Sequence, residues 1–300
     1  DVPGDRLGAA IDAGEIGVVP GFQGVTRDGR LTTLGRGGSD TSAVAVAAAL
    51  GCRCDIYTDV DGVYTTDPRI EQKARRLDRI SYEEMLEMAS LGAKVLQTRS
   101  VELAMAKQVP VRVLSSFIEP DEAGNLPVGA GTLICAEEEI VEKRIVSGVA
   151  MSRDEARITL LGLADRVDGP ADVFTRLAEA NVNVDMIVQS QSRTEGTVNL
   201  TFTTGRRDAQ RAAELMRAGQ AEIGFSEIRV DEDVAKVSVV GVGMRSHAGV
   251  AQTMFRALAD KGVKFQAIST SEIKISVLID AAYAELAVRA LHSAYGLETV

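Results

Sequence analysis

A glycine-rich turn at residues 35–40 (GRGGSD) carries the residues best suited to chemistry, and an alanine-rich segment follows it. The pattern predicts a strand, a turn and a helix over 40–50. The first turn of a helix has backbone N–H groups without internal partners and the positive end of the dipole, so this turn favours an anion. Arg36 adds a guanidinium fork that suits a carboxylate or a phosphate. Ser39 or Asp40 could cap the helix, and a capped strand–turn–helix without a ligand is the alternative.

A second polar cluster follows the next expected strand, over 55–60. Thr58 and Asp59 end this strand, and a glycine turn leads on to Tyr64 and Arg69. A polar strand end followed by such a turn suits a nucleotide base and ribose, and Arg69 could reach a phosphate. The alternative is a hairpin-like surface loop, because Asp-Gly turns are common in loops.

Lys94 is a third candidate, because it follows Gly92 at the expected start of a helix over 93–108. A cation at a helix start could bind a phosphate group, since the helix N-terminus favours the same anion. The alternative is an ordinary solvated lysine.

Metal and nucleophile chemistry find little support in the sequence. Three aspartates between residues 59 and 67 lack the spacing and the final glutamate of a calcium loop. The two histidines lie far apart, which argues against a histidine-based triad or metal cluster. Cys52, Cys54 and Cys135 fit core positions in a reducing compartment better than a disulfide framework or a zinc site. We therefore expect no metal centre built from protein ligands.

The composition narrows the class of protein. The chain has 300 residues, 45% of them hydrophobic, and a net charge of −10. Such an acidic balance argues against nucleic acid as a main partner. No apolar run approaches the roughly 20 residues of a membrane span, and no signal-peptide pattern opens the chain, so we expect a cytoplasmic protein that does not bind membranes. The chain begins at Asp1 in what reads as the middle of a fold, and part of the parent protein is expected to be missing.

The first half of the chain alternates strands and helices, which is typical of α/β layers with ligand sites at the carboxyl ends of the strands. Ser81 begins a capping box that predicts a helix start. A loop over 119–131 precedes the last expected strand, over 132–135. We also expect a short buried strand over 16–20 and a strand over 111–115.

The second half contains an internal duplication with a constant offset of 81 residues. Each copy predicts a strand, a glycine-bearing loop, an amphipathic helix, two strands and a helix, the βαββαβ order of ferredoxin-like modules. Two such copies more often bind a small regulator, or pair with each other, than catalyse a reaction. The matching residues are Gly162, Phe174, Leu177, Ala178, Val182, Ile187 and Ser190 with Gly243, Phe255, Leu258, Ala259, Val263, Ile268 and Ser271.

Taken together, these motifs resemble the aspartate kinase family (aspartokinases). The matching strings are VVPGFQGVTRDGRLTTLGRGGSDTSAVAVAAALG, IYTDVDGVYTTDPR, ISYEEMLEMASLGAKVL, VSVVGVGMRSH and ISTSEIKISVLI. The resemblance covers essentially the whole chain. It implies an α/β fold in which a partial amino-acid-kinase domain, a carbamate-kinase-like three-layer sandwich over 1–138, precedes two ferredoxin-like ACT domains over 139–230 and 231–300.

The resemblance also implies a reaction, the ATP-dependent phosphorylation of the L-aspartate β-carboxylate with Mg²⁺. This is the first step of lysine, threonine and methionine biosynthesis, and the ACT domains would make it subject to feedback by lysine or threonine. By matching motif, Arg36, Gly37, Gly38 and Ser39 would bind aspartate, and Asp40 would organise the reacting groups. The residues implied to bind ATP are Thr58, Asp59, Tyr64, Arg69, Lys94 and Val95. Since the substrate carboxylate is the nucleophile, no catalytic histidine is required.

Departures from the family pattern set further expectations. The Lys-Phe-Gly-Gly and Gly-Glu-Gln segments of the family's kinase domain do not occur in these 300 residues, so we expect the chain alone to lack kinase activity. A non-catalytic, amino-acid-binding regulatory subunit is the alternative, although such a subunit would not need the motifs over 35–94. Another amino-acid kinase with a different acid substrate fits the paired ACT half less well.

The regulatory half resembles the family least in its first effector loop. The residues implied to bind an amino-acid effector there are Asp165, Asp168, Gly169, Gln189 and Ser190, and several neighbours differ from the usual pattern. Either lysine or threonine therefore fits as effector, and one copy could be purely structural. Exposed sheet edges in such modules predict a homodimer, or a higher oligomer, through the ACT half.

Overall fold

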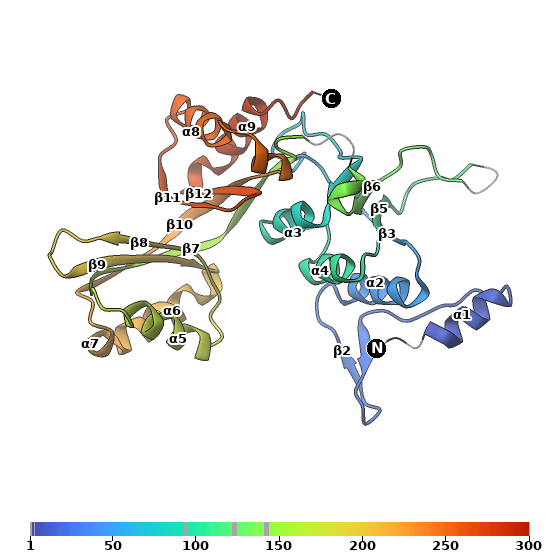
Figure 1. Ribbon diagram of the computed structural model, residues 1–300, viewed down its shortest axis with the longest axis horizontal. Coiled ribbons are helices and arrows are strands. Elements are labelled where there is room, and N and C mark those ends of the chain that lie inside the picture. The colour runs from blue at the N-terminus through green and yellow to red at the C-terminus, as the bar shows by residue number, and fades with distance from the viewer. Residues whose placement is uncertain (1, 3, 93–94, 122–124, 141–143, 300) are drawn as a thin grey trace.

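The computed structural model describes residues 2, 4–92, 95–121, 125–140 and 144–299. The chain forms two halves that lie side by side (Figure 1). The first half contains a four-stranded sheet in the order β3-β5-β6-β4, with β5 and β6 antiparallel and the other neighbours parallel. Its elements are α1 (Gly4–Asp12), β1 (Gln23–Val25), β2 (Leu31–Thr33), α2 (Gly38–Leu50), β3 (Cys54–Thr58), β4 (Arg79–Ser81), α3 (Tyr82–Ser90), α4 (Thr98–Lys107), β5 (Val111–Ser115), β6 (Thr132–Cys135) and the 3-10 turn η1 (Glu137–Glu139).

The first core lies between this sheet and helices α2, α3 and α4. Met85 of α3, Ala104 of α4 and Val113 of β5 are all fully buried in it. The predicted capping box is confirmed, because the Ser81 side chain accepts the Glu84 N–H while the Glu84 carboxylate accepts the Ser81 N–H. The mixed sheet with helices packed on it confirms the α/β class of this half.

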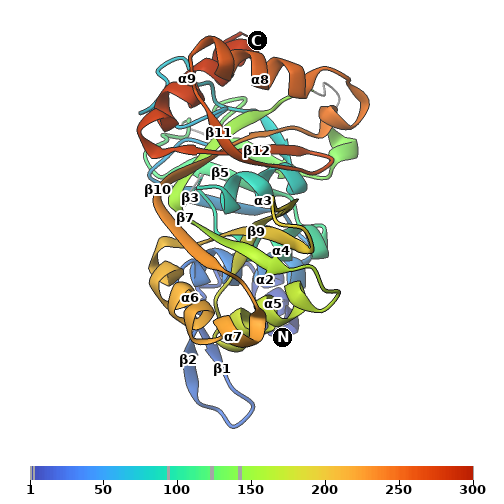
Figure 2. The same cartoon turned by 90° about the vertical axis from the view of Figure 1, so that its left-hand side faces the viewer.

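Two sequence predictions in this half are wrong. Residues 16–20 form no strand and are largely exposed, with Ile16 92% exposed; no described strand pairs with them, and the nearby hairpin β1–β2 projects from the body instead (Figure 2). The helix predicted over 93–108 begins only at Thr98. Residues 95–97 are described and are not helical, and Leu96 is buried in the first core.

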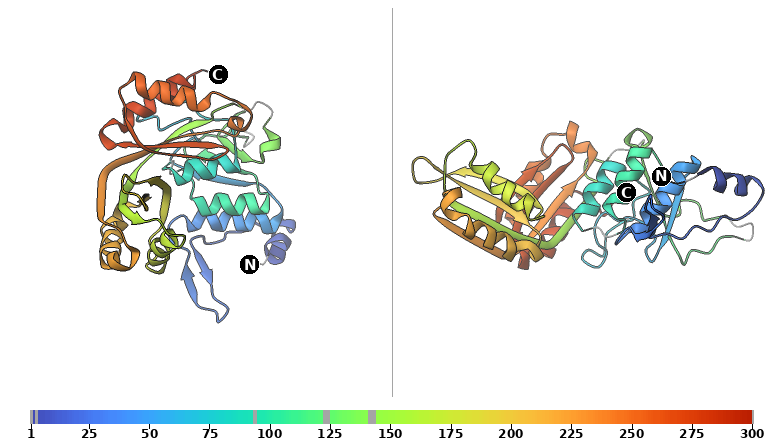
Figure 3. Two further views of the ribbon diagram at one scale, coloured as in Figure 1. Left: turned by 60° about the vertical axis from the view of Figure 1, so that its left-hand side comes forward. Right: turned by 90° about the horizontal axis from the view of Figure 1, so that it is seen from below.

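The second half is one antiparallel sheet of six strands in the order β11-β12-β10-β7-β9-β8, with its helices packed on it (Figures 2 and 3). The first copy has the predicted βαββαβ order, from β7 to β10. The second copy begins at β10 and ends with α9, so its predicted last strand is absent among the described residues, and the start of β7 lies beside the end of β10 instead. The elements are β7 (Gly148–Ala164), α5 (Gly169–Glu179), β8 (Val184–Gln191), β9 (Thr197–Thr204), α6 (Arg206–Ala218), α7 (Gln220–Ile223), β10 (Glu227–Val240), η2 (Val242–Ser246), α8 (Val250–Asp260), β11 (Phe265–Thr270), β12 (Lys274–Asp280), η3 (Ala281–Tyr283) and α9 (Ala284–Ala294).

Strands β7 and β10 each belong to both copies. The start of β7 pairs with the end of β10, and the end of β7 pairs with the start of β10. Accordingly, Val149 lies in the core under α8 and α9, whereas Ile158 lies in the core under α5 and α6. The two modules are therefore interlocked rather than consecutive, and boundaries at 139–230 and 231–300 stay a prediction.

A buried ion cluster lies where β7 and β10 pass from one module to the other. Lys236 is 6% exposed and its Nζ lies 2.6 Å from Oε1 of the buried Glu155; it also pairs with Asp185. Burial by itself would lower the pKa of Lys236, but the two carboxylates outweigh it and the net pKa is raised. The register of the β7–β10 pairing shifts at this point. The ion pair of Lys236 with Glu155 therefore links the two strands where their backbone hydrogen bonding is irregular.

Candidate functional site

The turn over 35–40 joins β2 to α2, and its geometry depends on glycine. Gly37 is the N-cap of α2 with φ 74°, a left-handed conformation. A Cβ built on it would lie 1.8 Å from Cγ of Gln97. The prediction that Ser39 or Asp40 caps the helix is wrong: α2 begins at Gly38, and no side chain caps it. The Gly38 N–H donates to the Gly35 carbonyl oxygen at 3.0 Å, so the N–H groups of Ser39 and Asp40 are the ones left for a ligand at this helix start.

Arg99, which sequence reasoning missed, holds this turn in place. Its Nη2 donates to the carbonyl oxygen of Leu34 at 2.8 Å and to that of Arg36 at 3.3 Å. Arg99 lies in the first turn of α4, where the helix dipole disfavours a cation. A basic residue in the first turn of a helix therefore indicates nearby acceptors for its side chain, and here these are the carbonyl oxygens of the turn. The contact brings the turn against the N-terminus of α4, so two helix N-termini meet beside it.

Asp40 lies in the first turn of α2, partly buried between these elements. Burial raises the pKa of its carboxyl group, and a hydrogen bond from the Gln97 backbone partly opposes this. Arg36 and Ser39 are exposed on the same turn. The turn therefore presents one guanidinium, one hydroxyl and free helix N–H groups, with the carboxyl group of Asp40 next to them.

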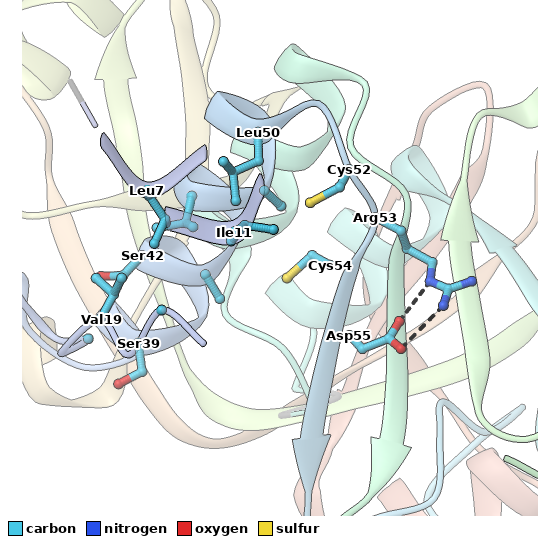
Figure 4. Close-up of a pocket in the computed structure, with 15 residues that line it drawn as sticks. Leu7, Ile11, Val19, Ser39, Ser42, Leu50, Cys52, Arg53, Cys54 and Asp55 are labelled. Carbon is cyan, nitrogen blue, oxygen red and sulfur yellow. Dashed lines mark hydrogen bonds and ion pairs between the residues drawn. The ribbon is translucent and has the colours of Figure 1, made fainter. Parts of the chain in front are cut away.

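Ser39 also lines an open groove of about 500 Å³ between α1, α2 and β3 (Figure 4). The groove is mainly apolar, with Leu7 and Ile11 of α1 among its lining residues. Cys54 is buried beside it, as predicted, but Cys52 is exposed; it follows the end of α2, where the chain crosses the surface. All three cysteines are free thiols in this structure.

The residues expected to bind a nucleotide come from the end of β3 and the loop after it. The hydroxyl group of Thr58 donates to Oδ1 of Asp59 at 3.1 Å. The hydroxyl group of Tyr64 donates to Asp61 at 3.0 Å, and burial, followed by Asp61, raises the Tyr64 pKa. These polar groups lie at the carboxyl end of a parallel strand pair, β3 and β5, where α/β proteins place ligands.

Two other residues predicted to bind the nucleotide have side chains that already contact other parts of the protein. Arg69 is mostly exposed and forms an ion pair with Asp67 at 2.7 Å, so it reaches a phosphate only by exchanging this partner. The side chain of Val95 packs against the first core, which leaves its backbone for a ligand. Lys94 lies outside the described residues.

Comparisons with known proteins identify the family. The chain matches the model of the amino acid kinase family over residues 3–115 and that of the ACT domain over 158–218 and 237–295. It is 53% identical to the aspartate kinase of Stutzerimonas stutzeri, covering 99% of this chain and 70% of that protein. It is 54% identical to the aspartokinase of Pseudomonas aeruginosa, covering 98% of this chain and 69% of that protein. The chain belongs to the aspartokinase family.

Solved aspartokinase structures agree with this. The structure of E. coli aspartokinase III in complex with aspartate and ADP matches with a TM-score of 0.71 and 33% identity, over 91% of this chain and 59% of that one. The Clostridium acetobutylicum enzyme matches in fold with a TM-score of 0.79, at 23% identity, over 93% of this chain and 62% of that one. An aspartate kinase with ACT regulatory domains is thus confirmed, and the kinase-family match over 3–115 argues against the purely regulatory alternative.

In this aspartokinase the loop of the first ACT copy that is expected to bind an effector lies exposed on the surface. Asp165 and Asp168 are exposed between β7 and α5, while Gly169 is buried at the start of α5. Asp168 does not cap α5; its carboxylate lies 3.6 Å from Arg166. The other two effector candidates, Gln189 and Ser190, are exposed on the edge strand β8, and Ser190 is paired with Asn199 on β9.

The corresponding loop of the second copy is docked on the first half. Oε1 of Glu84, a residue of α3, accepts the Val242 N–H at 2.9 Å and the Ser147 hydroxyl at 2.6 Å. Glu84 is only 2% exposed. Arg245 of the same loop pairs with Glu137 at 2.8 Å.

Among the described residues no group of three or more His, Cys, Asp and Glu could hold a metal, and no helix is long and apolar enough to cross a bilayer.

Proposed function

We propose that the turn over 35–40 binds the aspartate substrate of this aspartate kinase. Arg36 would hold a carboxylate of aspartate through two parallel hydrogen bonds, with Gly37 and Ser39 donating to the same substrate. The Gly38 N–H donates to the Gly35 carbonyl oxygen at 3.0 Å, so Gly38 would shape the turn around the substrate rather than donate to it. The observation that carries this proposal is the convergence of two helix N-termini on the turn, fixed by the hydrogen bonds from Arg99. Such a site stabilises negative charge without moving groups at the moment of reaction.

We infer that ATP lies beyond the end of β3, with Thr58, Asp59 and Tyr64 near the base and ribose. Arg69, Lys94 and the backbone of Val95 would lie near the phosphates. Polar groups at the carboxyl end of parallel strands support this placement. Mg²⁺ would accompany ATP and would supply positive charge against its phosphates; such an ion needs only one or two protein carboxylates.

The chemical step needs positioning more than a reactive protein group. An oxygen of the aspartate β-carboxylate attacks the γ-phosphorus of ATP, a new P–O bond forms, and the bond to ADP breaks. Negative charge spreads over the transferred group in the transition state. Arg36, the N–H groups of α2 and the helix end at α4 would stabilise this charge, and Asp40 would orient these donors.

For regulation, we propose that the first ACT copy binds lysine or threonine through Asp165, Asp168, Gly169, Gln189 and Ser190. The E. coli aspartokinase III structure with lysine and aspartate, 33% identical over 92% of this chain, supports lysine as a candidate. The unpaired edges of β8 and β11 support a homodimer or higher oligomer through the ACT half. We further propose a cytoplasmic location, in keeping with the free thiols.

A paired kinetic experiment on the complete gene product tests the two substrate sites. Arg36→Ala should raise KM for aspartate about 10- to 100-fold, the loss of a charged hydrogen-bonded pair, and leave KM for ATP within about twofold. Arg69→Met should do the reverse. Arg30→Met is the matched control, because Arg30 pairs with Asp28 on the exposed hairpin turn. Equal effects of Arg36→Ala on both KM values would contradict the assignment.

A further inference from the structure

The loop that carries Tyr64 and Arg69 is attached to the second ACT copy through the residue between them, Thr65. Thr65 is fully buried. Its carbonyl oxygen accepts the Val149 N–H of β7 at 2.8 Å. The backbones approach so closely that a Cβ on Gly148 would lie 2.9 Å from the same oxygen. The loop thus extends the edge of the regulatory sheet.

The side chain of Thr65 makes a second contact, with a buried histidine of the regulatory half. Its hydroxyl oxygen lies 2.9 Å from Nε2 of His292, a residue of α9 that is fully buried. The same hydroxyl accepts the Arg75 N–H at 3.0 Å. The Thr65 N–H in turn donates to the Arg75 carbonyl at 2.8 Å. The two arms of the loop, at residues 65 and 75, and helix α9 therefore meet at this one hydroxyl group.

The surroundings of His292 suit a neutral ring. Its Nδ1 is buried and has no hydrogen-bond partner among the described residues. An imidazolium would need acceptors at both nitrogens, so protonation would leave one N–H buried without an acceptor. The sheet face under α9 is apolar, with Val149 and Val237 in the same core. Burial lowers the pKa of His292; Glu71 and Glu298 oppose this, and Lys73 adds to it.

We propose that His292 is a positioning residue for ATP, acting through Thr65 on the loop that presents Tyr64 and Arg69. The inference rests on the proposed placement of ATP at that loop. The pair fixes the loop against α9, so a movement of the second ACT copy changes the nucleotide side of the site first. The aspartate side, which Arg99 holds from within the first half, stays unchanged.

The kinetic test uses two matched pairs of variants of the complete gene product. Thr65→Val and His292→Leu each remove the hydrogen bond, whereas Thr65→Ser and His292→Gln can keep it. The first two should raise KM for ATP about three- to tenfold, the range for one neutral hydrogen bond, and leave KM for aspartate within about twofold. The second two should stay within about twofold of wild type for both substrates. Lys73→Met, which breaks the exposed pair of this loop with Glu298 at 2.8 Å, is the control.

A pH profile separates positioning from a purely structural role. Burial lowers the pKa of His292, so the ring of the folded enzyme stays neutral at the ordinary histidine pKa and is protonated only at lower pH. As the pH falls below the ordinary histidine pKa, the wild-type KM for ATP should therefore rise more than that of His292→Gln, which cannot titrate. Parallel profiles for the two enzymes would overturn the proposal.

The outcomes distinguish this inference from the site assignment. If Tyr64→Phe and Arg69→Met both leave KM for ATP unchanged, the proposed nucleotide site is wrong. If they raise it while Thr65→Val and His292→Leu do not, only the role of His292 is wrong. If Thr65→Val and His292→Leu raise both KM values equally, the pair supports the fold alone and the positioning role is also wrong.

Discussion

The two ACT copies have the same sequence pattern but different surroundings. Helix α5 and strand β8 of the first copy reappear 81 residues later as α8 and β11. The strands before these helices differ, however. In the first copy β7 continues to Ala164 and the loop after it is open, whereas β10 ends at Val240 and the 3-10 turn η2 follows. The two copies thus share the order of their helices and strands but differ in the loop that follows the first strand.

Contacts with the first half explain the difference. Glu84 of the first half accepts the Val242 N–H. A Cβ on Gly243 would also lie 2.4 Å from the carbonyl oxygen of Arg144, in the segment just before β7. In the first copy the matching Gly162 N–H donates to Asn199 at 3.2 Å, within its own module. The first loop is therefore free to bind a small molecule, and the second is occupied in attaching the regulatory half to the kinase half. We propose that the first copy serves effector binding and the second serves docking.

The largest expected effect concerns the sheet that both copies share. Lys236→Met would leave Glu155 buried without its cation, and removing one partner of a buried pair costs about 3–5 kcal/mol. We expect the free energy of unfolding, measured by urea denaturation, to fall by about this amount. Arg153→Met removes a pair with Glu285 in which both side chains are about half exposed, and it should cost less than about 1 kcal/mol. Similar losses in the two variants would show that the ion cluster does not hold the copies together.

A smaller effect is expected from the docked loop alone. Glu84→Ala removes the acceptor of three donors, the buried N–H groups of Ser81 and Val242 and the partly buried Ser147 hydroxyl. The free energy of unfolding should fall by about 2–4 kcal/mol, and hydrogen exchange should accelerate at 242–246 but not at 161–165. Glu84→Gln retains an acceptor for Val242 and Ser147 and should cost about 1 kcal/mol through the lost cap bond. Unchanged exchange at 242–246 in Glu84→Ala would contradict the docking role.

Periodicity and motif strings predicted the α/β half, the duplication and the glycine turn, because local patterns encode them. They did not predict the contacts between distant segments. The hydrogen bonds from Arg99 to the turn, and the one between Thr65 and His292, join residues 63 or more positions apart, and no local pattern indicates them. The strand expected over 16–20 failed for the same reason, since a strand requires a partner and its apolar sequence does not specify one.

Binding of lysine and threonine, measured by calorimetry on the complete gene product, tests the division of the copies most directly. Asp165→Asn and Ser246→Ala change matching positions of the two loops, 81 residues apart. Asp165→Asn should raise the Kd of the effector about tenfold, because one charged hydrogen bond is lost, and Ser246→Ala should leave it within about twofold. Weaker binding in Ser246→Ala with unchanged binding in Asp165→Asn would contradict the account.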